Sequence, residues 1–250
     1  MYTPKAIIEI FHLMFLRQFS AQIDSNLYAV KGGCNLRFFF NSIRYSEDLD
    51  LDIRTIQMQT LKSKVDKILA SLPLLKLLQG YGVTQISFSA PKQTETTQRW
   101  KIQLQTSNSE LPLHTKIEFS RRADVTEREL GSVGMRICQA YGLSPTRLSH
   151  YGHDAAVAQK VLALANRTLT QARDIFDLYH LLHISKPQAA EYEPEVLAKA
   201  QEALASISFA DYKSQVVNFM EIDQQEIYDS DDYWQTISNQ VFQYLSELER

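Results

Sequence analysis

The stretch Ser46-Glu-Asp48-Leu-Asp50-Leu-Asp52-Ile53 alternates strictly between acidic and apolar residues from Asp48 onward. Successive side chains of an extended strand point to opposite faces, so the pattern predicts a strand with three aspartates on one face and its apolar residues in the core. Aspartates at this spacing, about 6.6 Å between Cα atoms, repel one another unless solvent or a cation intervenes. Mg²⁺ prefers oxygen ligands, commonly one or two carboxylates with phosphate oxygens and water. The stretch therefore predicts either a metal site at Asp48 and Asp50 or a solvated, charged strand face.

A glycine pair lies about 15 residues upstream of these aspartates. The apolar run Leu27-Tyr-Ala-Val30 predicts a strand, and Lys31-Gly32-Gly33 predicts a tight turn before a short helix over residues 34–41. Glycine lets the backbone approach a phosphate closely, and the free N–H groups of a helix's first turn favour an anion. Combined with the aspartates, the turn indicates a nucleoside triphosphate site; alone, it indicates only a turn.

A third carboxylate is offered by Leu113-His-Thr-Lys-Ile-Glu118-Phe119, which also alternates. A second metal ion, if present, clamps the attacking and leaving oxygens and needs a further carboxylate ligand. We expect Glu118 to lie on a neighbouring strand and face the aspartates. The alternative is a solvated or lysine-paired glutamate.

The remaining pattern predicts an α+β chain, a mixed sheet with flanking helices followed by a C-terminal helical bundle. An amphipathic helix is expected over residues 56–79. Three further strands, expected as antiparallel neighbours, are predicted at 83–89, 99–106 and 113–120. From residue 144 onward the pattern is almost wholly helical. We expect a catalytic α/β domain at 1–140 and a helical domain at 141–250 that contributes to the active site.

The helical part carries cations and aspartates at helical spacing. Lys160 and Arg167 are seven residues apart and so share one helix face, and both side chains suit phosphate binding. Asp174 and Asp177 follow one turn apart and could orient these cations or hold a base. The alternative is an interhelical network of ion pairs.

Composition narrows the class of protein. A chain of 250 residues with 44% hydrophobic content can bury a substantial core, and the net charge of −3 does not favour binding of nucleic acid by bulk electrostatics. Two cysteines, Cys34 and Cys138, have no metal-ligand or disulfide spacing, as is typical of a reducing compartment. The apolar part of residues 1–19 is too short to span a membrane, so we expect a buried helix and a cytoplasmic protein.

The order and spacing of these motifs resemble the AbiEii/AbiGii-type toxin nucleotidyltransferases of the polymerase-β-like superfamily. The resemblance covers most of residues 27–182. It rests on four segments: Lys31-Gly-Gly-Cys-Asn-Leu-Arg37, Arg44-Tyr-Ser46-Glu-Asp48-Leu-Asp50, Lys116-Ile-Glu118, and residues 160–179 with Arg173-Asp174-Ile-Phe-Asp177.

The resemblance implies Mg²⁺-dependent transfer of a nucleoside monophosphate from a nucleoside triphosphate (NTP), using one or two ions. The acceptor it implies is transfer RNA, and the setting is a type IV-like toxin–antitoxin system with a cognate antitoxin as partner. Catalytic roles fall on Asp48, Asp50, Lys160, Asp174 and Asp177, with Asp48, Asp50 and Glu118 as metal ligands. Nucleotide binding falls on Gly32, Gly33, Cys34, Asn35, Arg44, Ser46 and Arg167.

One position departs from the family pattern. The family usually has Thr or Ser directly after Gly-Gly, where a hydroxyl can bind phosphate, and this chain has Cys34, leaving Asn35 as a substitute donor. The departure motivates one alternative, a catalytically weakened module that binds nucleotide or protein. Another alternative is a nucleotidyltransferase that acts on a small molecule, with the same Asp-x-Asp chemistry and a different acceptor.

Overall fold

The computed structural model describes residues 2–121, 128–188 and 190–249. The chain forms two compact units. The first comprises Met1–Phe39 and Tyr45–Tyr151, and the second comprises Phe40–Arg44 and Gly152–Arg250. We call them the sheet unit and the helical unit.

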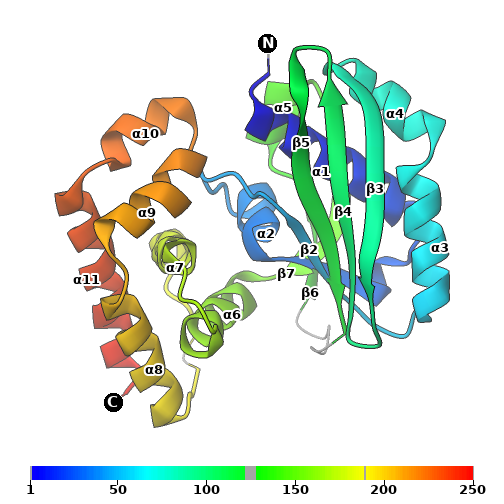
Figure 1. Ribbon diagram of the computed structural model, residues 1–250. Coiled ribbons are helices and arrows are strands. Elements are labelled where there is room, and N and C mark those ends of the chain that lie inside the picture. The colour runs from blue at the N-terminus through cyan, green and yellow to red at the C-terminus, as the bar shows by residue number, and fades with distance from the viewer. Residues whose placement is uncertain (1, 122–127, 189, 250) are drawn as a thin grey trace. The chain divides into compact units, whose positions relative to one another are not determined.

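The strands of the sheet unit build one mixed sheet, which confirms the predicted fold class (Figure 1). Within the described residues it has seven strands in the order β3-β4-β5-β2-β1-β7-β6. Their bounds are β1 Tyr28–Lys31, β2 Leu49–Ile53, β3 Val83–Gln93, β4 Thr97–Thr106, β5 Ser109–Ser120, β6 Arg128–Ser132 and β7 Arg147–Tyr151. The aspartate-bearing β2 is central, parallel to β5 on one side and antiparallel to β1 on the other. The three predicted neighbours β3, β4 and β5 form an antiparallel meander.

Helices cover the sheet and enclose its core. They are α1 Pro4–Ser20, α2 Gly32–Phe39, α3 Met58–Leu69, α4 Leu72–Gln79 and α5 Met135–Tyr141, with a 3₁₀ turn at Ser25–Leu27. The Thr3 hydroxyl accepts a hydrogen bond from the Ala6 N–H and Pro4 fills the first turn, so α1 begins where helix-capping rules place it. Its fully buried Phe15 and Phe19 stack with a centroid distance of 5.8 Å, and Phe19 also contacts Phe119 of β5.

The expected single helix over residues 56–79 is wrong, because two helices occupy this segment. Ser71 caps α4 by accepting from the Leu74 N–H, and Pro73 lies in the first turn. Proline has no N–H, and in a continuous helix its ring would clash with the carbonyl four residues earlier. The chain therefore ends α3 at Leu69 and restarts at Leu72.

The expectation of helix from residue 144 onward is wrong for residues 147–151. These form β7, in which His150 is the partner of Val30 in the parallel pairing with β1. Leu148 and Tyr151 are buried. The pairing joins segments about 120 residues apart, so no local pattern announces it.

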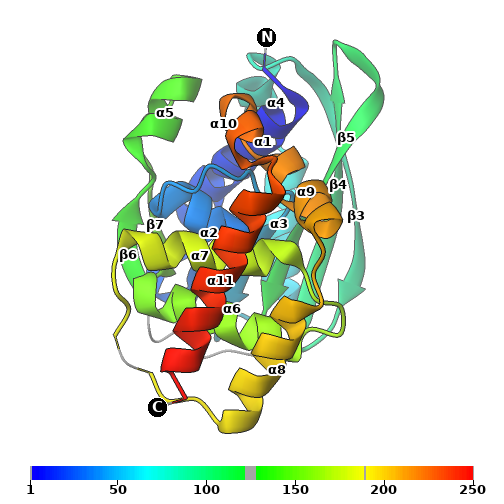
Figure 2. The ribbon, with the colours of Figure 1, turned by 90° about the vertical axis from the view of Figure 1, so that its left-hand side faces the viewer.

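The helical unit consists of α6 His153–Asn166, α7 Ala172–Ile184, α8 Pro194–Ala205, α9 Phe209–Gln215, α10 Ile222–Tyr228 and α11 Asp231–Glu247, with a 3₁₀ turn at Val217–Phe219. Both α6 and α11 pack against α7 and α8 (Figure 2). Fully buried Tyr212 stacks on Trp234 with a centroid distance of 4.8 Å. This unit therefore has a core of its own.

Residues 40–44 connect α2 to the aspartate stretch and belong to the helical unit. The Glu221 N–H donates to the Ile43 carbonyl at 3.1 Å, and Arg44 forms an antiparallel bridge with Met220. His180 Nε2 lies 2.8 Å from the Phe40 carbonyl oxygen. The segment that leads into Ser46 is thus fixed at both ends by helical-unit residues.

Candidate active site

The acidic face of β2 has the geometry predicted from its alternation. Asp50 is the register partner of Lys31 in β1 and of Glu118 in β5, so Glu118 stands beside it as expected. Asp48 lies 2.8 Å from the Lys116 ammonium, and Glu118 lies 2.6 Å from the Arg99 guanidinium. Within the described residues, no hydrogen bond engages the half-buried Asp50 carboxylate. Burial, and then the neighbouring charge of Asp48, raise the pKa of Asp50.

Asp52 belongs to the same row but has a different environment. Its side chain is buried, and it accepts hydrogen bonds from the Lys31 ammonium at 2.5 Å and the Tyr151 hydroxyl at 2.8 Å. An ion pair and a second donor satisfy this carboxylate. Of the three aspartates, Asp50 is therefore the one whose carboxylate has no ion pair or hydrogen bond among the described residues, and Asp48, paired with Lys116, lies next to it.

The glycine turn comes close to this carboxylate. Gly32 has φ of +64°, in the left-handed region that glycine adopts without strain. A Cβ at this position would lie 3.2 Å from Asp50 Oδ2. The helix α2 begins at Gly32 itself, two residues earlier than expected. The N–H groups of Gly32 and Gly33, in the first turn of this helix, are therefore next to Asp50. N–H groups in this position suit the binding of a phosphate.

Two side chains hold the backbone at Asp48. The Ser46 hydroxyl donates to the Asp48 carbonyl oxygen at 2.8 Å, and the Cys34 thiol donates to the same oxygen at 3.3 Å. Burial raises the pKa of the Cys34 thiol well above its ordinary value, so it stays protonated as a donor. Cys34 is therefore a buried hydrogen-bond donor that helps to fix the backbone of the aspartate stretch.

A second set of hydrogen bonds, through His12 and Thr115, holds the carbonyl group of Glu47, the residue before Asp48. The Thr115 hydroxyl donates to the Glu47 carbonyl oxygen at 2.7 Å, which uses its one proton. His12 Nε2, 2.8 Å from Thr115 Oγ1, must then be the donor in that contact, leaving Nδ1 facing Cys34 Sγ at 3.7 Å. Burial lowers the pKa of His12 to about 3, so the ring is neutral. His12 and Thr115 have no signal in the sequence that marks them as part of the site, because they come together with Cys34 only in the folded chain.

Asn35 is also turned inward. Its amide nitrogen donates to the Tyr151 carbonyl at 3.0 Å, and its amide oxygen lies 3.1 Å from His150 Nδ1. The side chain is buried, with 1% of its surface exposed. Its polar atoms thus join α2 to β7.

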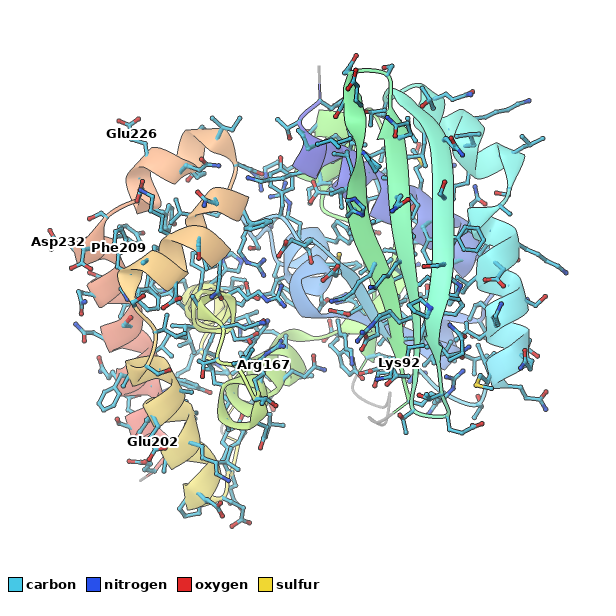
Figure 3. All side chains as sticks on the ribbon, viewed as in Figure 1. Lys92, Arg167, Glu202, Phe209, Glu226 and Asp232 are labelled. Atoms are coloured by element: carbon cyan, nitrogen blue, oxygen red, sulfur yellow. The ribbon has the colours of Figure 1, made fainter. Side chains whose placement is uncertain are left out.

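The other predicted residues come together in the helical unit. Arg44 donates to both carboxylate oxygens of Asp177 at 2.9 Å, and the Lys160 ammonium lies 2.6 Å from Asp177 and 2.9 Å from Asp174. Arg167, which is labelled in Figure 3, follows the last residue of α6. Its guanidinium lies 2.5 Å from the Asp174 carboxylate. Only Arg167 among these side chains is substantially exposed, at 39%. These contacts form the interhelical network of ion pairs that was the alternative to a phosphate-binding role for these residues.

The pKa shifts in this network follow its charges. Burial alone would raise the pKa of Asp177, but Arg44 and Lys160 outweigh it and lower the pKa to about 2. Burial opposes the charge of Lys160, yet Asp174 and Asp177 raise its pKa. The pKa of Asp174 is lowered as well, so Lys160, Asp174 and Asp177 are charged at neutral pH.

The donor set of the sheet unit fits a divalent cation. Among the described residues, no three His, Cys, Asp or Glu side chains converge as a complete metal cage. Mg²⁺ does not need one, since it commonly takes one or two carboxylates and completes its shell with phosphate oxygens and water. Asp48 and Asp50, with an unsatisfied carboxylate and a raised pKa at Asp50, suit this mode of binding.

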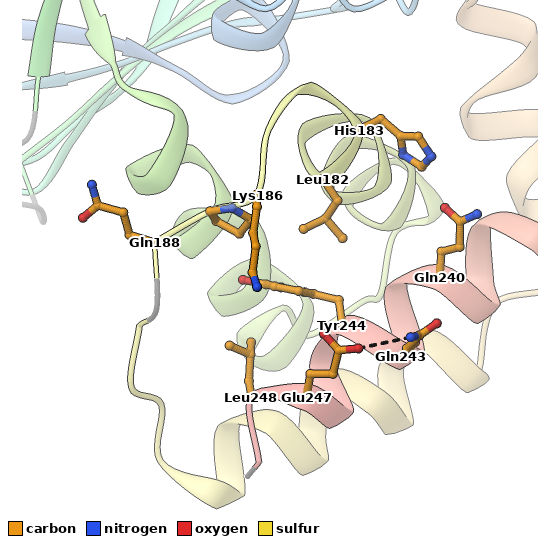
Figure 4. Close-up of a pocket in the computed structure, with 10 residues that line it drawn as sticks. Leu182, His183, Lys186, Gln188, Gln240, Gln243, Tyr244, Glu247 and Leu248 are labelled. Carbon is orange, nitrogen blue, oxygen red and sulfur yellow. Dashed lines mark hydrogen bonds between the residues drawn. The ribbon is translucent and has the colours of Figure 1, made fainter.

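The helical unit has a separate hollow of about 710 Å³ between the end of α7, residues 186–188 and the end of α11 (Figure 4). Gln243 and Glu247 are joined across one helical turn at 3.1 Å. No predicted site residue is among those that line it. We assign it no role in the chemistry.

A glycine turn entering a short helix beside an Asp-x-Asp strand of a mixed sheet defines the class as nucleotidyltransferase. The chain matches the family model described as "Nucleotidyl transferase AbiEii toxin, Type IV TA system" over residues 14–247. It therefore belongs to the AbiEii nucleotidyltransferase toxins of type IV toxin–antitoxin systems, as the motifs indicated.

Solved structures share the fold. MenT4, a nucleotidyltransferase toxin from Mycobacterium tuberculosis, is 17% identical with a TM-score of 0.62, and the match covers 98% of this chain and 85% of that one. JHP933 from Helicobacter pylori is 16% identical with a TM-score of 0.57, covering 100% of this chain and 96% of that one. No curated protein sequence matches the chain. Among the described helices, none is long and apolar enough to cross a membrane.

Proposed function

We propose that this chain transfers a nucleoside monophosphate from an NTP to a hydroxyl group of transfer RNA, and that the reaction depends on Mg²⁺. The observation that carries the proposal is the half-buried Asp50 carboxylate, which no described hydrogen bond satisfies and which lies against the Gly32 turn. A phosphate on that turn would lie beside the two carboxylates that bind the cation. The family match supplies the NTP as substrate and an antitoxin as partner.

The reaction is a displacement at the α-phosphorus. The acceptor oxygen forms a bond to phosphorus, the bond to the bridging oxygen breaks, and pyrophosphate leaves with the electron pair while the hydroxyl proton passes to water. Bound Mg²⁺, held by Asp48 and Asp50 and by Glu118 if a second ion binds, would supply charge neutralisation. The chain's own part is to orient these groups: Cys34 and Ser46 hold the Asp48 carbonyl, and α2 offers its N–H groups to phosphate.

The proposal also gives the helical unit a part. Lys160 and Arg167 would neutralise charge on the phosphates, with Asp174 and Asp177 orienting them. Arg167 is the more accessible of the two cations. The Arg167→Gln variant in the assay below tests this part, with a raised KM for NTP as the expected result.

The contacts of Cys34 argue against the alternative that the chain is a catalytically weakened binding module. Its thiol already donates to the Asp48 carbonyl, so the departure from Thr or Ser keeps a donor at that oxygen. This supports an active enzyme.

The test is transfer of label from each of four α-labelled NTPs to total transfer RNA. We expect one or more nucleotides to label the RNA, and periodate oxidation of its 3′ end to abolish labelling. Labelling that survives oxidation would contradict a terminal hydroxyl acceptor. If NTP binds and no RNA is labelled, the transfer RNA proposal fails, and protein and small-molecule acceptors are the next to test.

Toxicity and the cytoplasmic setting are tested separately. Growth of cells that express the chain, with and without the antitoxin, tests toxicity, and cell fractionation tests the location.

A further inference from the structure

The polar face of the β3-β4-β5 meander continues the acidic face of β2. Its residues stand in cross-strand rows, because paired residues share a face of the sheet. One row is Ser87, Gln103 and His114, and the next is Ser89, Lys101 and Lys116. Lys116 meets Asp48 at 2.8 Å, so the second row leads directly to the metal-binding carboxylates.

This face bounds a hollow of about 700 Å³. Ser87, Lys101, Gln103 and His114 line it, and Glu47 and Asp48 line it as well. The hollow therefore extends from the meander to Asp48.

Cations face one another across the strands. Lys101 is the direct register partner of Lys116, and Lys92, at the end of β3 in Figure 3, is the partner of Arg99. Like charges placed directly opposite destabilise a sheet. Lys116 and Arg99 are neutralised by Asp48 and Glu118. The side chains of Lys92 and Lys101 form no ion pair or hydrogen bond with any residue that the structure describes.

Two further donors on the face are also uncommitted. The side chains of Gln103 and His114 are exposed, and within the described parts of the chain neither has a hydrogen-bond partner. Two lysines without an ion pair among the described residues, with spare donors near Asp48, are what an anionic ligand would use.

The order of the strands separates this face from the nucleotide. The Gly32 turn follows β1, on one side of β2, and the meander begins with β5 on the other side. At about 4.8 Å per strand, β4 and β3 lie about 10 and 14 Å from β2. A triphosphate bound at the glycine turn would therefore not reach the lysines of the meander, which would be free to bind a second ligand. Asp48 and Asp50 would lie between the triphosphate and that second ligand.

We infer that the meander face, defined by Lys92, Lys101, Gln103 and His114, binds the phosphodiester backbone of the acceptor RNA as a single strand and leads its end to Asp48 and Asp50. The inference rests on the proposed function for its acceptor. Contacts of this kind read the backbone and not the bases, so binding is independent of sequence and weakens with salt.

The test compares Lys101→Glu with Lys76→Glu, the same charge change at an exposed residue of α4. The probe is a fluorescein-labelled single-stranded RNA of twelve nucleotides, read by anisotropy. We expect Lys101→Glu to weaken RNA binding about tenfold and Lys76→Glu to leave it unchanged. Lys101→Gln should reduce the slope of log affinity against log salt by about 0.7, the value for one lost phosphate contact on a single strand. Thermal unfolding checks that each variant folds.

Equal RNA binding by Lys101→Glu and Lys76→Glu overturns the inference, as does a loss of NTP affinity in place of RNA affinity. The Asp50→Asn variant separates the two proposals, because it should bind the RNA and fail to transfer label. If the wild type transfers nothing to RNA and Lys101→Glu still loses RNA binding, the meander face stands and the proposed acceptor chemistry falls.

Discussion

Asp50 and Glu118 are direct partners in the parallel pairing of β2 with β5, with Lys31 opposite Asp50 on the other side. The carboxylate of Glu118 is neutralised by Arg99, while that of Asp50 has no such partner among the described residues. In the folded chain without a bound cation, the charged form of the Asp50 carboxyl is therefore disfavoured.

Replacing Asp50 by Asn should raise the melting temperature when no divalent cation is present. The pKa of Asp50 is raised in the folded state, so ionisation at neutral pH lowers stability, and Asn removes that charge. Asp48→Asn is the matched control, since it breaks an ion pair with Lys116 and should give no such increase. Thermal unfolding in chelator measures both. A lower melting temperature for Asp50→Asn would contradict the assignment.

Gly32→Ala should reduce nucleotidyl transfer by at least tenfold. The methyl group meets Asp50 Oδ2 at 3.2 Å and strains a backbone with φ of +64°. Gly142→Ala is the control, because Gly142 has φ of +62° and an added methyl meets nothing within 4 Å. Both should lose about 1 kcal/mol of stability from backbone strain, and only Gly32→Ala should lose activity. Equal activity in the two variants would show that the close approach to Asp50 is unimportant.

Cys34→Ser should keep the KM for NTP within about twofold of the wild type. The side chain is buried against the Asp48 carbonyl, where hydroxyl and thiol can both donate. Cys34→Ala removes the donor and should lower turnover about three- to tenfold, the equivalent of one hydrogen bond. A large fall in KM for Cys34→Ser would mean that residue 34 binds phosphate directly.

The helical unit should lose stability in acid. Because the pKa of Asp177 falls from 3.8 to about 2 on folding, its contribution is complete above pH 4 and is lost as the pH falls through 2. The loss corresponds to about 2 kcal/mol. Urea unfolding of Trp100→Phe, followed by the fluorescence of Trp234, measures it; Asp177→Asn in the same background should show a flatter profile. Identical profiles would contradict the charge assignment.

Local patterns were enough to predict much of the sheet unit. The alternation around Asp50 and Glu118 predicted both strands and the face on which each carboxylate lies, because period-two burial is a local property. Their adjacency was expected from the need for a third carboxylate, and the pairing of β2 with β5 confirms it. The break before Leu72 was missed, although Pro73 signals it. The strand β7 had no comparable signal, since its partner β1 lies far away in sequence.

In the candidate site too, some residues could be predicted from the sequence and others could not. The residues proposed to bear its chemistry stand in short sequence motifs, whereas several residues that position them do not. His12 reaches the aspartate stretch only through Thr115, from a helix that reads simply as buried. The ion pair of Arg44 with Asp177 spans more than 130 residues, so its geometry is a property of the fold alone.

The most direct test of the central claim is transfer of label from an α-labelled NTP to RNA by the wild type and by Asp48→Asn and Asp50→Asn, with Mg²⁺ or with chelator. We expect labelling by the wild type with Mg²⁺ only, and a loss of at least 100-fold in each variant, in line with removal of charge stabilisation from a transition state. Labelling in chelator, or by a folded Asp50→Asn variant at the wild-type rate, would contradict it.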